Sequence, residues 1–196
     1  MWILSLEWLV LAVAVFWATG AFKRLKRLRA AARDAFGVLD VQFVQALQVL
    51  RDSADGSAPA DATAAAMARR ARTALLASAN LLQAALAKAR LQPLNAELLA
   101  SLDSAWQSLQ VAWQSHVQQD VGNQEVADVF SPDSEVQRWV ALMVVHQHHT
   151  EQFNAAVADY NRAIGQFPAC LLARVAGLKP GRLFQKDAAL YTPHTA

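Results

Sequence analysis

The chain has 196 residues, of which 55% are hydrophobic and 17% are charged, with a formal net charge of +2 and a single cysteine. This length suits one folded domain and is too short for several. A single cysteine excludes an intramolecular disulfide framework, and seven glycines with six prolines leave little turn material for a fold of many strands. The composition therefore predicts an all-α protein.

The N-terminal run, residues 2–22, is long and apolar enough to form a transmembrane helix. It reads WILSLEWLVLAVAVFWATGAF, and Glu7 is its single charged residue. At about 1.5 Å of rise per residue, a helix of this length matches a hydrocarbon core of about 30 Å. A cleaved signal peptide is the alternative, but the basic residues follow the apolar run instead of preceding it. We therefore expect a retained transmembrane anchor over residues 1–22.

A basic juxtamembrane collar, residues 23–34, follows the anchor. Six cations precede the only acidic residue of this segment, Asp34, and they are Lys23, Arg24, Lys26, Arg27, Arg29 and Arg33. The positive-inside rule keeps such a segment in the cytoplasm, which predicts a single-pass protein with its N-terminus outside. The same cluster predicts contact with anionic lipid headgroups. Outside the collar acidic residues outnumber basic ones, so nucleic acid is not an expected partner.

Apolar residues at helical spacing predict three amphipathic helices before residue 121. The first is continuous with the anchor, and its apolar positions are Leu25, Leu28, Ala32, Phe36, Leu39, Phe43, Ala46 and Leu50. After a turn at residues 52–61, the second helix runs to about residue 91, with Leu75, Ala79, Leu82, Leu86 and Ala89 on one face. The third helix repeats Leu99, Leu102, Trp106, Leu109, Trp113 and Val117, which we interpret as core positions.

A fourth helix is expected to start with Ser131 as N-cap and Pro132 at its first position, and to end before Pro168. Its predicted buried stripe is Val136, Val140, Met143, Gln147, Thr150, Phe153, Val157, Tyr160, Ile164 and Phe167. Four amphipathic helices joined by short links predict an antiparallel up-and-down four-helix bundle.

Two asparagines on this helix need an explanation, because Asn154 and Asn161 lie one heptad apart and each directly follows an aromatic residue. Each amide can both donate to and accept from a neighbouring helix. We predict that the pair fixes the register between helices, with Asp40 of the first helix as a partner. The alternative is a polar groove that binds a peptide or a headgroup. Neither asparagine has a nucleophile or base beside it, so catalysis by these residues is not expected.

Two segments resemble those of the LemA family. Residues 153–173, FNAAVADYNRAIGQFPACLLA, are similar to the family's C-terminal signature, aromatic-Asn-x-x-Val-x-x-Tyr-Asn-x-x-Ile-x-x-Phe-Pro. Residues 35–43, AFGVLDVQF, are similar to the segment that follows the family's anchor. The matching positions are Asp40, Phe153, Asn154, Val157, Tyr160, Asn161, Ile164, Phe167 and Pro168. The chain departs from the pattern at Gln45, Ala46 and Thr150, where the family commonly has arginines, so it resembles a divergent member.

The resemblance implies a LemA-like helical bundle over residues 35–170 and a tail, residues 171–196, that packs beside the end of the bundle. Alternatively, the apolar and basic residues of the tail lie on the membrane surface. LemA-like proteins are bacterial membrane proteins, which implies the inner (cytoplasmic) membrane with the bundle in the cytoplasm. The resemblance further implies a non-enzymatic scaffold or interaction protein that organises protein or membrane assemblies, through a protein partner or self-association. An adaptor that delivers clients to a membrane protease is the alternative.

The histidines His146, His148 and His149 raise a third alternative, a metal-dependent hydrolase. His146 and His149 are three residues apart and share a helix face, but zinc sites use three or four protein ligands. We therefore expect solvated or interfacial histidines, and no metal, cofactor or catalytic residue. The sequence also has no G-x-G-x-x-G, no Walker loop and no G-x-S-x-G motif.

Overall fold

The computed structural model describes residues 2–54, 62–121 and 134–185, and the side chains of residues 8–9, 11–52, 65–119 and 134–185. The described ranges contain the helices α1 (Trp2–Ala54), α2 (Ala62–Leu91), α3 (Ala96–Val121), α5 (Glu135–Gly165) and α6 (Ala169–Val175). These ranges contain no β-strand, and the predicted all-α class is confirmed for them. Most of the turn predicted at residues 52–61 lies outside the described residues.

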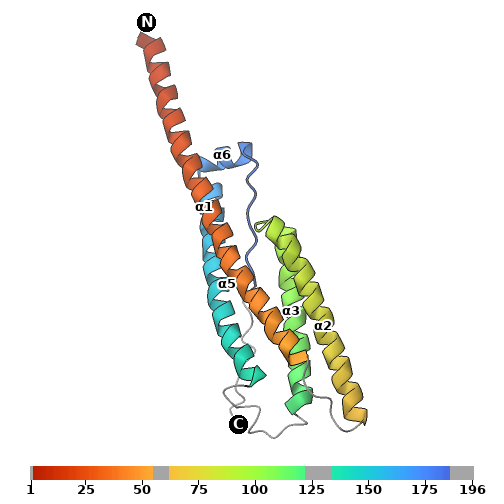
Figure 1. The fold of residues 1–196 in the computed structure, drawn as a ribbon. Coiled ribbons are helices and arrows are strands. Elements are labelled where there is room, and N and C mark those ends of the chain that lie inside the picture. Colours follow the sequence, from red (N-terminus) through yellow and green to blue (C-terminus); the bar gives the residue numbers. More distant parts are fainter. Residues whose placement is uncertain (1, 55–61, 122–133, 186–196) are drawn as a thin grey trace, which may run out of the picture.

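The four long helices run up and down antiparallel to one another (Figure 1). The closest packing is within two pairs, α1 with α5 and α2 with α3, and α1 also contacts α2. This arrangement agrees with the predicted antiparallel four-helix bundle. It follows from amphipathic helices with one apolar stripe each, which must be buried against neighbouring helices.

The apolar stripes of α1, α2 and α3 form most of the core, as predicted. Nearly all of the predicted positions are less than a tenth exposed; Leu28 and Val117 are half-buried. The fully buried side chains include Leu39 and Phe43 of α1, Leu75 and Leu82 of α2, and Leu102 and Leu109 of α3.

The first half of α5 departs from the predicted stripe. Trp139, Leu142 and His146 are buried there, each one residue before a predicted position, whereas Val140 is 49% exposed. Trp139 stacks on Trp113 with 4.7 Å between ring centroids, and this aromatic packing decides which face of the helix points inward. From Thr150 onward the predicted stripe is buried at Phe153, Val157 and Tyr160.

The start of α5 also differs from the prediction. The helix begins at Glu135, and Ser134 is the N-cap, whose hydroxyl accepts a hydrogen bond from the Gln137 N–H at 3.3 Å. The predicted cap residues Ser131 and Pro132 lie outside the described residues.

The N-terminal part of α1 projects beyond the other helices (Figure 1). The apolar side chains described there are mostly exposed, including Trp8 at 70%, Val13 at 61% and Phe16 at 81%. Among the residues that the structure describes, no helix has the length and apolar character needed to cross a membrane. The predicted anchor includes residues 1–7 and 10, whose side chains lie outside the described set.

After α5 the chain turns into α6, which lies crosswise at the end of the bundle (Figure 1). A Schellman motif ends α6: the Leu178 N–H donates to the Ala173 carbonyl at 2.8 Å, and the Gly177 N–H donates to the Arg174 carbonyl at 3.2 Å. Gly177 has φ 63°, a conformation that other residues rarely adopt. The chain therefore reverses here and runs back along the bundle.

Candidate functional site: a groove that holds the strap

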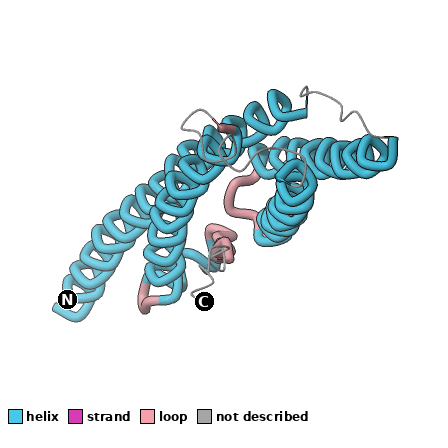
Figure 2. Tube along the Cα trace, turned by 90° about the horizontal axis from the view of Figure 1, so that it is seen from below, coloured by secondary structure: helices cyan, strands magenta, loops and turns pink. Residues whose placement is uncertain are grey.

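Residues 178–185, here called the strap, run without regular secondary structure in the space between the two helix pairs (Figure 2). The sequence favours this conformation, because Pro180 lacks an N–H and the residue before a proline avoids helical angles. The strap lies beside the second half of α5. Nearer the start of α5, Trp106 and Trp113 of α3 stack directly on Trp139. The groove is therefore the part of the α3–α5 interface that the strap fills.

The two asparagines of α5 hold the main chain of the strap. Asn154 donates to the Phe184 carbonyl at 3.0 Å and accepts from the Phe184 N–H at 2.8 Å. Asn161 does the same with Gly181, with both distances 2.8 Å. Each amide thus satisfies both polar groups of one strap residue, as a neighbouring β-strand would.

The heptad spacing of the asparagines matches the rise of the strap. Seven residues of α-helix span about 10.5 Å, and the three steps from Gly181 to Phe184 span about 10 Å in an extended chain. Because Asn154 holds Phe184 and Asn161 holds Gly181, the strap runs antiparallel to α5. Two amides at this spacing therefore define both the direction and the register of the strap.

Tyr160 adds a third contact to the strap main chain, because its hydroxyl donates to the Lys179 carbonyl at 3.0 Å. Burial raises the pKa of Tyr160, and the positive charges of Arg29 and Arg33 partly oppose this effect. The phenol therefore keeps its proton at neutral pH and remains a donor.

Besides its main-chain hydrogen bonds, the strap has one buried aromatic ring and one close backbone contact with α5. Phe184 is 7% exposed, and its ring centroid lies 5.3 Å from that of Phe153 and 6.2 Å from that of Phe43. At Gly181 an added Cβ would come within 3.0 Å of Val157 Cγ1, so a side chain at this position requires Val157 to move. The strap is thus held by its main chain, by one buried aromatic ring and by close backbone packing.

Polar contacts to α3 complete the groove. Gln107 donates to the Gln185 amide oxygen at 3.1 Å, and Arg182 lies 3.9 Å from the carboxylate of Asp103. Asp103 is only 5% exposed, so its charge faces the strap from a largely buried position.

The predicted pairing of Asn154 and Asn161 with another helix is wrong. Their partners are the main-chain groups of the strap, and Asp40 instead forms an ion pair with Arg90 of α2 at 2.8 Å. The physical reason is that an amide on the flank of the buried stripe faces the gap between helices. An unpaired main chain lying in that gap offers better partners there than a side chain of a helix does.

The other signature residues take different positions. Phe153 and Val157 are fully buried, and Ile164 packs on a smaller cluster with Leu25 and Ala173. The prediction that Phe167 is buried is wrong, since it is 80% exposed beyond the end of α5. Pro168 immediately precedes α6 and forms a cis peptide bond with Phe167.

Sequence reasoning missed Gly181 and Phe184, the two strap residues that the asparagines hold. The signals were weak: a Pro-Gly pair that breaks helices, followed by one aromatic residue in a short basic tail. The predicted packing of the tail beside the end of the bundle is observed for α6, whereas the strap runs back between the helix pairs and its Phe184 joins the main core. Residues 186–196 lie outside the described residues.

The collar lies on α1 where the bundle begins. Lys23, Arg24, Lys26, Arg27 and Arg33 are exposed, and Arg29 is half-buried. The collar therefore presents most of its charge to the surroundings.

The expectation of solvated or interfacial histidines is wrong for His146, whereas His148 is exposed and His149 is half-buried. His146 is only 2% exposed and packs between the rings of Trp106 and Phe43, with centroid distances of 4.3 and 5.0 Å. Burial, with a smaller contribution from His149, lowers the pKa of His146 to about 4. His148 and His149 bond to the Gln152 side chain. Among the described residues, no three His, Cys, Asp or Glu side chains come together as metal ligands.

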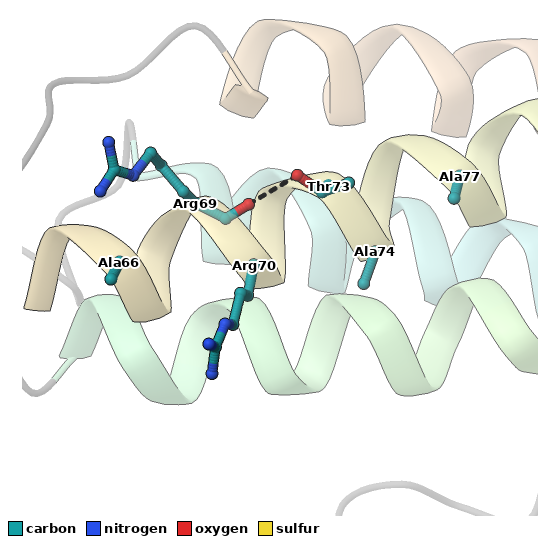
Figure 3. Close-up of a pocket in the computed structure, with 6 residues that line it drawn as sticks. All are labelled: Ala66, Arg69, Arg70, Thr73, Ala74 and Ala77. Carbon is teal, nitrogen blue, oxygen red and sulfur yellow. Dashed lines mark hydrogen bonds between the residues drawn. The ribbon is translucent and has the colours of Figure 1, made fainter.

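A separate hollow on α2 is lined by Ala66, Arg69, Arg70, Thr73, Ala74 and Ala77 (Figure 3). All six residues come from one helix, and the Thr73 hydroxyl donates to the Arg69 carbonyl within that helix at 2.8 Å. The hollow brings together no groups from different elements, so it is not a candidate site.

The fold and the groove define a helical bundle that holds its own C-terminal strap through paired amides. Comparisons with protein-family models, with curated proteins and with solved structures give no match for this chain. The resemblance to the LemA family therefore remains a prediction from the residues quoted above.

Proposed function

We propose that the chain is a divergent LemA-like protein of the bacterial inner membrane, anchored by residues 1–22 with its bundle in the cytoplasm. In this proposal it is a non-enzymatic scaffold or interaction protein that organises protein or membrane assemblies. Its partners are the lipid bilayer and another protein or further copies of itself.

The observation that carries the proposal is the continuity of α1 from Trp2 to Ala54. Its projecting part exposes apolar side chains on every side, among them Leu9, Leu11, Val13, Val15 and Phe16. A helix that is apolar all round needs an apolar environment, and an exposed patch of this kind marks an interaction site. The exposed cations of the collar follow directly, which is the order expected at the cytoplasmic face of a membrane.

Anchoring is tested by fractionating cells that produce the full chain with a C-terminal tag. We expect the protein in the membrane fraction and resistant to extraction with alkaline carbonate. Replacing Val13 and Phe16 by arginine should move it to the soluble fraction, because an arginine at the centre of a span is costly. The matched control replaces two exposed valines of the bundle, Val111 and Val144, by arginine and should stay in the membrane. Extraction of the unmodified chain by carbonate would contradict the anchor.

The scaffold is tested by crosslinking in the native membrane from photoreactive residues at Val140 and Val144. These valines lie on the outer face of α5 and are 49% and 66% exposed. Capture of the protein's own copies and lipid is the expected result for a self-assembling scaffold. Capture of one distinct membrane protease would instead favour the adaptor.

A further inference from the structure

An unexplained apolar surface lies at the end of the bundle, on and beside α6. Phe167, Leu171 and Val175 are exposed by 80%, 56% and 90%. Leu171 and Val175 are four residues apart and therefore share one face of α6. Ala173, which is 3% exposed, lies on the opposite face and packs on the bundle. The outer face of α6 is thus apolar and points away from the protein.

The contacts made by the inner face of α6 define the position of α6 along the axis of α1. Ala173 packs with Leu25 of α1 and Ala163 of α5, and Leu28 packs against the same cluster. Leu25 and Leu28 are three and six residues beyond the end of the proposed span, which corresponds to about 5 to 9 Å along a helix. The polar layer on each side of a bilayer core is about 5 to 8 Å thick. A span over residues 1–22 therefore places α6 at the depth of the lipid headgroups.

The charges at this height suit an anionic lipid surface. Lys23, Arg24, Lys26 and Arg27 are exposed on the adjacent turns of α1, and Arg174 is exposed on α6. Cations beside apolar side chains are the pattern of helices that lie in the interfacial plane of a membrane. α6 also lies crosswise to α1, so a span that crosses the bilayer places α6 along its surface (Figure 1).

We infer that α6 is a second membrane contact: Phe167, Leu171 and Val175 enter the headgroup layer of an anionic bilayer beside the basic collar. This inference rests on the proposed transmembrane anchor and adds a surface to it. Two contacts, one along α1 and one along α6, fix the orientation of the bundle relative to the membrane. The strap begins at Leu178, separated from the end of α6 by two residues, so its first residues lie at the same end of the bundle as this contact.

The test places an environment-sensitive fluorophore on single cysteines of the full chain, in a Cys170→Ala background that removes the native thiol. The positions are Leu171 and Val175 on α6, Val13 in the proposed span, and Val144 as a control on α5 that is 66% exposed. The protein is reconstituted in phosphatidylcholine vesicles with and without phosphatidylglycerol, and with lipids that carry a quencher near the headgroup.

We expect quenching at positions 171 and 175 to exceed that at position 144 at least threefold, and to increase with phosphatidylglycerol. Val175→Glu should reduce the quenching of the probe at 171, and Val144→Glu should not. Val175 is so exposed that its replacement leaves the fold intact, which the helical circular dichroism checks. If positions 171 and 175 match position 144 while position 13 lies in lipid, the inference is wrong and the anchor stands. If position 13 also lies in water, the anchor itself is wrong.

Discussion

The side chains of Asn154 and Asn161 act on the strap as a neighbouring strand would. An amide carries a donor and an acceptor on one planar group, so it can pair with the N–H and the C=O of a single residue. Both asparagines are half-buried, where each unmade hydrogen bond costs about 1 to 3 kcal/mol. The strap is therefore fixed at Gly181 and Phe184, and the effect of each asparagine can be measured separately.

Asn161→Ala should increase amide hydrogen exchange at Gly181, because that N–H loses its acceptor at 2.8 Å. We expect an acceleration of about tenfold, corresponding to about 1.4 kcal/mol, and a smaller change at Phe184. Asn154→Ala should show the reverse pattern. Gln147→Ala, at an exposed position of the same helix, is the control and should change neither amide. Equal acceleration of both amides by either variant would contradict separate fixation.

His146 illustrates how burial changes the chemistry of a residue. Within the described part of the chain, neither His146 Nδ1 nor Trp106 Nε1 has a hydrogen-bond partner. A charged imidazole enclosed by Trp106 and Phe43 loses its hydration, so the neutral form is strongly favoured. His146 therefore behaves as a core residue, and it makes stability depend on pH.

Stability should fall as the pH decreases from about 7 to about 4. The pKa of His146 is about 4 in the folded protein and 6.5 in the unfolded chain, so the unfolded chain binds the proton more readily. The stabilising effect is complete above the unfolded pKa and is lost progressively down to the folded one, by at most about 3 kcal/mol. In thermal unfolding at several pH values, His146→Leu should show a smaller decrease in Tm than the unmodified chain. An identical decrease in both proteins would assign the pH dependence to other groups.

At the level of elements, the strap is a segment without regular secondary structure that packs in the groove and contributes Phe184 to the core. It packs tightly against α5 at Gly181, where an added Cβ would lie 3.0 Å from Val157 Cγ1. The helix surface and the strap are therefore complementary at a scale of one methyl group, and the interaction can be tested by paired substitutions.

Gly181→Ala should loosen the strap, and Val157→Ala should partly relieve this effect by removing the methyl groups that the new Cβ meets. We expect a coupling of at least 0.5 kcal/mol or so between the two substitutions in a double-mutant cycle on stability. Limited proteolysis of the strap gives an independent readout, faster in Gly181→Ala than in the double variant. Simple additivity of the two effects would show that the close contact has no energetic role.

A surface ion pair between α1 and α2 and a buried leucine of α2 allow two kinds of contribution to stability to be compared. The Asp40–Arg90 ion pair joins the helices at 2.8 Å, but its side chains are 22% and 49% exposed. Leu82 of α2 is completely buried in the core. These two contacts should therefore differ strongly in their contribution to stability.

Asp40→Asn should lower the free energy of unfolding by less than about 1 kcal/mol, because water and salt screen an exposed pair. Leu82→Ala should lower it by about 2 to 5 kcal/mol, since it removes apolar contacts and leaves a cavity. Thermal unfolding followed by circular dichroism compares the two. A larger effect of Asp40→Asn would mean that the ion pair has a role in the fold that its exposure does not indicate.

At the scale of the whole molecule, α1 joins the proposed span to the bundle in one helix of 53 residues. Because the helix is continuous, the bundle lies on the same side of the membrane as the collar. The charges of the collar should therefore decide on which side of the membrane the bundle lies. This consequence belongs to the assembled protein and can be measured without knowledge of its partner.

Replacing Lys23, Arg24, Lys26 and Arg27 by glutamate should invert or scramble the topology in the membrane. We expect a C-terminal reporter that is active only in the cytoplasm to lose most of its signal. The four side chains are exposed, so the core stays intact. Replacement by glutamine separates the loss of positive charge from the gain of negative charge. An unchanged reporter signal would show that the collar does not direct insertion.

The sequence by itself determined the all-α class, the buried stripes of α1, α2 and α3, and the second half of the α5 stripe. These features follow from local periodicity, which each helix carries independently of its neighbours. The sequence also singled out Asn154 and Asn161, because two amides at heptad spacing beside a buried stripe are unusual, and Tyr160 through its place in the LemA-like signature. The tertiary structure decided what those residues bind, because their partners lie 19 to 30 positions away in a tail without periodicity. It also decided that His146 is buried and Phe167 is exposed, since burial depends on which elements approach one another and not on the local pattern.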